Sequence, residues 1–154
     1  MKPGLGGLTL ACHRGLAAAR QLVMPTTPDS VSVPPPSPMP VALCEPDPLL
    51  CALLGEWLQR AHYLPLSDAA ASCASARVVL VVADLPAPRL DGAARIAILR
   101  QRFPGAKVLA ISGQFMGWLN GCTATASALG ADAILAKPFT SALFIDAVRM
   151  IVPA

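Results

Sequence analysis

The sequence predicts a doubly wound α/β domain, in which helices cover both faces of a parallel sheet. Two observations predict this fold. After residue 40, five short apolar segments alternate with segments that have helical periodicity. One of them, VVLVVA at 78–83, is continuously apolar, as a central parallel strand buried on both faces should be. Right-handed crossovers then favour the flavodoxin-like strand order 2-1-3-4-5.

Residues 1–40 differ from the rest of the chain in composition. The stretch 25–40, PTTPDSVSVPPPSPMP, contains seven prolines, which oppose helices and central strands. We expect 1–40 to be a disordered, Pro-rich N-terminal tail and 41–152 to form one folded domain. The alternative of a signal peptide before residue 25 is disfavoured, because His13 and Arg14 interrupt its apolar run.

The first half of the domain is expected to contain two strands and two helices before the central strand. VALC (41–44) is a short apolar strand. Pro48 begins a helix whose apolar residues recur at 50, 53, 54, 57, 58 and 61, the spacing of one buried face. YLPL (63–66) is a strand that its proline places at a sheet edge, and an alanine-rich helix follows over 68–76.

The second half is expected to contain three helices and two strands. Asp91 caps a helix that ends near Phe103, and its inward-facing residues are expected to be Ala93, Ile96 and Leu99. KVLAIS (107–112) and AILA (133–136) are the last two strands, separated by a weaker helix over about 118–129 that ends at Gly130. Thr140 caps the final helix, whose apolar face is Phe144, Ala147, Val148 and Ile151.

Composition excludes several classes of protein. A net charge of +3 is too small to predict nucleic-acid binding. The longest charge-free run, 108–131, holds polar residues and glycines throughout, so a membrane span is not expected. The five cysteines include no Cys-x-x-Cys pair, which argues against a zinc site or a disulfide framework. The sequence therefore predicts a cytoplasmic protein that binds neither nucleic acid nor membrane.

Polar residues gather where the predicted strands end. Glu45 and Asp47 follow the first strand, Asp84 ends the third, Ser112 ends the fourth and Lys137 follows the fifth. In doubly wound sheets the carboxyl ends of the strands form the functional edge. Carboxylates brought together repel each other unless a cation relieves them, and an oxygen-only ligand set favours Mg²⁺. This combination predicts phosphoryl transfer to a carboxylate, with Asp84 as the central candidate.

The motifs at this edge resemble those of the receiver domains of two-component response regulators. The resemblance covers roughly residues 41–152 and is carried by CEPDPLL, VVADLPAPRLDG, AISG and AKPF. In that family the aspartate ending the third strand is followed by proline at +4 and glycine at +8, which here are Pro88 and Gly92. Lys137–Pro138 matches the family's lysine and its cis-proline.

The resemblance implies a set of roles and partners. Asp84 would accept the phosphoryl group, Lys137 would contact it and Ser112 would be the switch hydroxyl. The donor would be a histidine kinase or a histidine phosphotransferase. Mg²⁺ would be held by Glu45, Asp47, Asp84 and the backbone carbonyl of Pro86. A downstream protein would contact the face formed by the fourth helix, fifth strand and fifth helix, and the protein would be a signalling domain and not an enzyme.

Two departures from the family pattern leave an alternative open. Pro46 replaces the second acidic residue after the first strand and has no side-chain oxygen, so metal affinity is expected to be weaker. Ile134 replaces the aromatic switch residue three positions before the lysine. Asp47 itself could simply begin a helix as part of an Asp-Pro turn. A stand-alone receiver is the preferred hypothesis, and the alternative is a pseudo-receiver that acts without phosphorylation.

Overall fold

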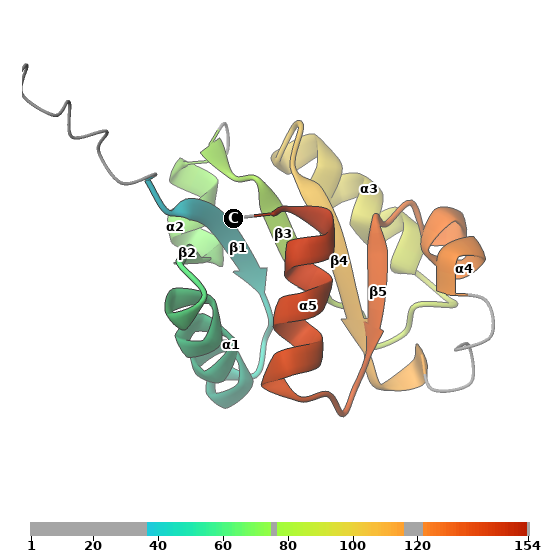
Figure 1. The fold of residues 1–154 in the computed structure, drawn as a ribbon. Helices are drawn as coiled ribbons and strands as arrows, with labels where there is room; N and C mark the ends of the chain where they lie inside the picture. The colour runs from blue at the N-terminus through green and yellow to red at the C-terminus, as the bar shows by residue number, and fades with distance from the viewer. Residues whose placement is uncertain (1–36, 75–76, 116–121, 154) are drawn as a thin grey trace, which may run out of the picture. The chain divides into compact units, whose positions relative to one another are not determined.

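The computed structural model describes residues 37–74, 77–115 and 122–153, and most of the predicted tail lies outside this part of the chain. The described strands are β1 (Met39–Cys44), β2 (Tyr63–Ser67), β3 (Leu80–Asp84), β4 (Lys107–Ser112) and β5 (Ala133–Ala136). The described helices are α1 (Pro48–Arg60), α2 (Asp68–Cys73), α3 (Gly92–Arg102), α4 (Cys122–Leu129) and α5 (Ser141–Ile151). The strands form one parallel sheet in the order β2-β1-β3-β4-β5, which confirms the predicted fold class and topology (Figure 1).

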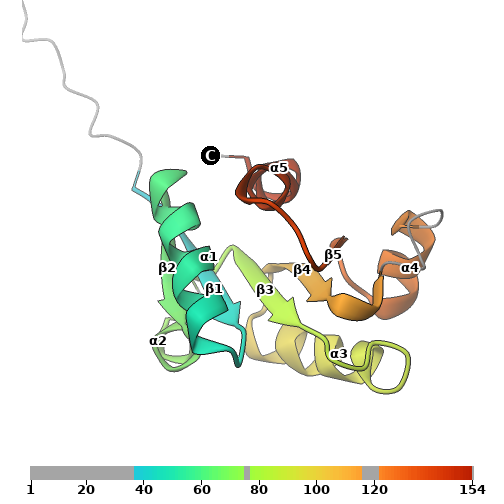
Figure 2. The same cartoon turned by 90° about the horizontal axis from the view of Figure 1, so that it is seen from below.

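The helices cover the two faces of the sheet, with α1 and α5 on one side and α2 and α3 on the other (Figure 2). Beneath α1 and α5 lies the largest core cluster, in which Leu54, Leu58, Phe144 and Val148 are fully buried against β1, β3 and β4. The opposite face buries a second set of side chains, among them Val81, Ile96, Phe103 and Phe115. Burial on both faces is the physical reason for the continuously apolar sequence of β3.

The ends of the helices follow the chemistry of their capping residues. At α1, the Asp47 carboxylate accepts hydrogen bonds from the backbone N–H groups of Leu49 and Leu50, at 2.9 and 3.3 Å. At α5, the Thr140 hydroxyl accepts one from Leu143 N at 3.3 Å, as predicted. Gly130 ends α4 with a φ of +76°, a left-handed conformation that glycine adopts without steric cost.

Several boundaries differ from the sequence prediction. β1 begins at Met39, two residues earlier than expected, and α2 ends at Cys73 instead of position 76. The first residues of the helix predicted over 118–129 lie outside the described part of the chain. Among the described residues, no helix combines the length and the apolar composition needed to cross a membrane.

α3 lies between Asp91 and Phe103, as predicted, but two details differ from the prediction. Asp91 occupies the N-cap position but makes no capping hydrogen bond, and its carboxylate instead lies 3.7 Å from Arg95 one turn later. Ala93 is exposed, because the helix turns Gly92 and Ile96 toward the core. A Cβ atom at Gly92 would lie 2.9 Å from Leu129 on α4, so the glycine is required by close helix packing.

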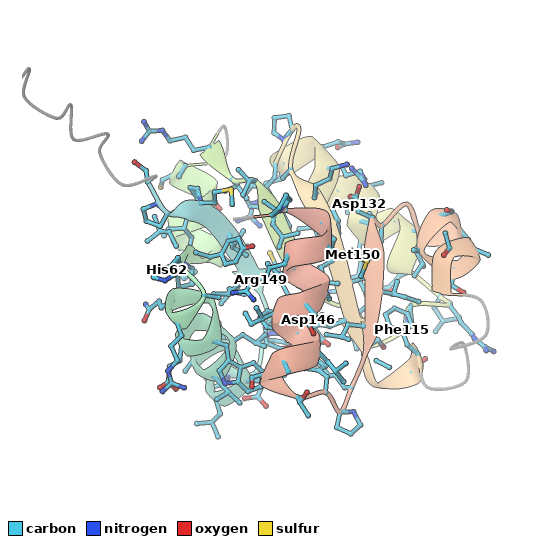
Figure 3. The ribbon with its side chains drawn as sticks, viewed as in Figure 1. His62, Phe115, Asp132, Asp146, Arg149 and Met150 are labelled. Atoms are coloured by element: carbon cyan, nitrogen blue, oxygen red, sulfur yellow. The ribbon has the colours of Figure 1, made fainter. Side chains whose placement is uncertain are left out.

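Asp132 lies between α4 and β5, at the amino ends of the strands and therefore opposite the carboxyl ends that carry Asp84 and Ser112 (Figure 3). It connects three segments of the chain. Its carboxylate accepts hydrogen bonds from Lys107 Nζ at 3.0 Å, Arg100 at 2.9 Å and the backbone N–H of Val108 at 2.9 Å. Burial acts to raise the pKa of Asp132, but these donors outweigh it and the pKa is lowered from 3.8.

We expect Asp132→Asn to lower the free energy of unfolding at pH 7 by about 1–2 kcal/mol, since both flanking cations are partly exposed. Because the native pKa is depressed, the carboxylate stabilises the fold above pH 3.8, and this contribution is lost as the pH falls below that value. Urea unfolding of both proteins between pH 7 and pH 3 measures the effect. The difference between them should shrink on acidification, and a constant difference would contradict the assignment.

Candidate functional site

The carboxyl ends of three strands bring an acidic pair and a lysine together. β1 and β3 are neighbours in register, so Glu45 follows β1 beside Asp84 at the end of β3. Lys137 follows β5, and its Nζ donates hydrogen bonds to Asp84 Oδ1 at 2.7 Å and to Glu45 Oε2 at 2.8 Å. Residues separated by 53 and 92 positions in sequence therefore form one cluster, as the sequence predicted for these three.

The charges in this cluster are only partly exposed to water. The exposed fractions of the side chains are 2% for Glu45, 12% for Asp84 and 25% for Lys137. Burial acts to lower the pKa of Lys137, but its hydrogen bonds and charge interactions with Asp84 and Glu45 outweigh burial and raise it. Lys137 is therefore positively charged at physiological pH, and its ammonium group pairs with both carboxylates.

Ser112 lies at the end of β4, fully buried between the strands that carry Asp84 and Lys137. Its hydroxyl accepts a hydrogen bond from the backbone N–H of Gln114 at 3.1 Å, and its carbonyl accepts one from Lys137 N at 2.9 Å. The Lys137–Pro138 peptide bond is cis, as the resemblance implied. The chain after β5 is thus fixed to the end of β4, which sets the position from which Lys137 reaches Asp84.

Gln114 is a site residue that sequence reasoning missed. Its Nε2 donates a hydrogen bond at 2.8 Å to the carbonyl oxygen of Pro86, across the end of the sheet. This contact joins the loop after β4 to the loop after β3, directly beside Asp84. A glutamine two residues after a strand has no distinctive signal, so only the spatial arrangement could reveal it.

The groups predicted to ligate Mg²⁺ do not come together as a set. Glu45 and Asp84 meet at Lys137, whereas the Asp47 carboxylate caps α1 and is exposed. The Pro86 carbonyl already accepts from Gln114. Within 37–74, 77–115 and 122–153, no three His, Cys, Asp or Glu side chains are grouped closely enough to hold a metal ion. The donors present therefore do not fit the predicted magnesium site.

A cleft of about 540 Å³ opens beside Asp84, between α2 and α3. Glu45, Pro46 and Asp84 line one end, and two arginines of α3 line the wall. The thiol of Cys44 also faces the cleft and donates to Asp68 Oδ1 at 3.3 Å. Burial, with the neighbouring carboxylate, raises the pKa of Cys44 to about 12, so this thiol is not a nucleophile at neutral pH. The cleft gives Asp84 its access to solvent.

Comparison with solved structures identifies the fold of this chain. The sequence matches no protein-family model and no curated protein. Among solved structures, a response regulator from Thermotoga maritima superposes with a TM-score of 0.62 at 17% identity, covering 76% of this chain and 99% of that one. A response regulator receiver domain from Bermanella marisrubri gives 0.58 at 26% identity, covering 75% and 98%.

A third similar structure is a response regulator from Burkholderia pseudomallei with a phosphorylated aspartic acid, a calcium ion and citrate. Its TM-score is 0.52 at 22% identity, covering 70% of this chain and 65% of that one. The first two matches cover nearly the whole of the matched chains, so the likeness extends over the complete fold and not over one motif. The chain therefore has the CheY-like fold of response regulator receiver domains.

Proposed function

We propose that this protein is a phosphoryl-accepting receiver of a two-component system, with Asp84 as the acceptor. The observation that carries the proposal is the hydrogen bond between Asp84 and Lys137 at the functional edge of a receiver fold. Asp84 is accessible through the cleft, and Lys137 lies where it can pair with an oxygen of an incoming phosphoryl group. The similar structure that contains a phosphorylated aspartic acid supports this chemistry.

In the proposed reaction, an Asp84 carboxylate oxygen attacks phosphorus and forms an acyl phosphate. The bond from phosphorus to the donor breaks, which is a P–N bond when the donor is a phosphohistidine and a P–O bond when it is acetyl phosphate. Lys137 remains protonated and exchanges part of its contact with the carboxylates for the phosphoryl oxygens. We propose a signalling protein and not an enzyme.

The proposed partners follow from the same chemistry. We propose that the donor is a histidine kinase or a histidine phosphotransferase, and that the protein acts in the cytoplasm together with the kinase. The negative charge of a phosphoryl group on Asp84 would attract Lys137 and the Ser112 hydroxyl, and these residues connect the site to β5 and β4. We propose the face formed by α4, β5 and α5 as the contact for a downstream protein, with no nucleic acid or membrane involved.

Treatment with acetyl phosphate, followed by intact-mass measurement, tests the proposal. Wild-type protein should gain the mass of one phosphoryl group, and Asp84→Asn should gain none, because an amide is not a nucleophile toward phosphorus. Asp68→Asn is a matched control, since Asp68 lines the same cleft but contacts Cys44 and not Lys137. Equal uptake by wild type and Asp84→Asn would contradict the assignment.

The alternative, a pseudo-receiver that acts without phosphorylation, is favoured by one structural feature. Ile134, at the position of the family's aromatic switch residue, packs against the buried cluster of Leu85, Ile96 and Phe115. This partly buried aliphatic side chain has no aromatic ring that could change its orientation when the Ser112 hydroxyl moves. Absence of phosphoryl uptake in a folded wild-type protein would support this alternative.

A further inference from the structure

The carboxylates of Glu45 and Asp84 already have hydrogen-bond partners within the chain. Glu45 uses both of its carboxylate oxygens, since Oε1 accepts from Asp47 N at 3.0 Å and Oε2 accepts from Lys137 Nζ. Asp84 Oδ1 accepts from the same nitrogen. A side chain that is 2% exposed cannot turn to water, so it must keep such partners or lose stability. A metal ion at this position would have to compete with the Lys137 ammonium for both carboxylates.

The other oxygen atoms nearby also accept hydrogen bonds within the chain. The Pro86 carbonyl accepts from Gln114 Nε2 at 2.8 Å. The Asp47 carboxylate accepts from two N–H groups at the start of α1 and does not line the cleft. Pro46 does line the cleft, as do Glu45 and Asp84. Mg²⁺ is usually held in proteins by one or two carboxylates together with water. Here the two carboxylates that line the cleft both accept a hydrogen bond from Lys137 Nζ, and Pro46 adds no side-chain oxygen.

We infer that this site uses the Lys137 ammonium in place of a divalent cation, and that Pro46 is the residue that keeps Mg²⁺ out. The choice of Mg²⁺ as the competing ion rests on the proposed function, because receiver-type chemistry is where that ion is expected. The measurement does not rest on it, since it uses unphosphorylated protein. Failure to phosphorylate and failure of this inference are therefore separate results.

A pair of nearly isosteric variants tests the inference. Pro46→Asp places a carboxylate in the cleft beside Glu45 and Asp84, and Pro46→Asn makes the same backbone change with no added charge. Thermal unfolding is measured in EDTA and in increasing millimolar MgCl₂, with isothermal titration of MgCl₂ into each protein. A ligand that binds only the native state raises the unfolding temperature in a saturable manner.

Wild type and Pro46→Asn should show the same unfolding temperature with and without Mg²⁺, and no saturable heat. Pro46→Asp should gain both responses, and Pro46→Asp/Asp84→Asn should lose most of that gain. Saturable Mg²⁺ binding by wild type that Asp84→Asn removes would overturn the inference. It would also be overturned if folded Pro46→Asp failed to bind, because then the missing carboxylate would not be what excludes the ion. Circular dichroism of each variant establishes that it is folded.

Discussion

Replacing Lys137 with Met is expected to destabilise the domain at pH 7 by about 2–3 kcal/mol. The lysine is hydrogen-bonded to both Glu45 and Asp84, and these carboxylates are nearly buried. Without the ammonium, two like charges remain close together in a poorly solvated position. The cost is smaller than for a fully buried pair, because a quarter of the lysine side chain is exposed.

A double variant separates this cause from lost packing. Lys137→Met/Glu45→Gln removes one of the two charges and should recover much of the loss at pH 7. Urea unfolding measures each protein. A Lys137→Met protein as stable as wild type would show that the lysine does not neutralise the pair.

Lys137→Met should also affect the proposed phosphorylation of Asp84. Since Lys137 is the cation nearest Asp84, its loss should also slow phosphoryl uptake from acetyl phosphate, measured by intact mass under conditions in which the variant is folded. The double variant with Glu45→Gln provides the necessary comparison, because it should be stable but still lack the ammonium. Normal uptake by the double variant would mean that Lys137 stabilises the acidic pair without taking part in transfer.

Phe144→Ala is expected to have the largest effect on stability, a loss of about 3–5 kcal/mol. Phe144 is fully buried beneath α5, and its ring centroid lies 5.8 Å from that of Phe139 and 6.0 Å from that of Trp57. Truncation removes the transfer free energy of the ring and leaves a cavity between α1, α5 and the sheet. Those elements are long and packed on several sides, so the cavity cannot close completely.

Leu143→Ala is the matched control for Phe144→Ala, because it removes a large apolar side chain from the preceding residue of the same helix. Leu143 is 55% exposed, so its truncation should change the free energy of unfolding by no more than about 0.5 kcal/mol. Equilibrium urea unfolding followed by far-ultraviolet circular dichroism measures both variants. Equal losses at 143 and 144 would contradict the burial pattern of α5.

Much of the fold could be predicted from sequence because its signals are local. Alternating apolar strands and helical periodicity identified every described element, and topological rules then gave the strand order that the structure has. The predicted ends of helices and strands were less accurate where the hydropathy pattern was weak, as in α2. The inward face of α3 was predicted correctly at Ile96, which is buried, and at Leu99, which packs against the core, but wrongly at Ala93. Glycine carries no hydropathy signal, so only the contact with Leu129 reveals that Gly92 faces the core.

The sequence alone predicts that Glu45, Asp84, Ser112 and Lys137 lie close together, because parallel strands place their carboxyl ends at the same side of the sheet. It could not determine how their atoms pair. Only the tertiary structure decided that Lys137 serves two carboxylates, that Asp47 caps a helix, and that Gln114 reaches Pro86. The physical reason is that a hydrogen bond depends on distance and direction in space, and its partners here are as many as 92 positions apart in the chain.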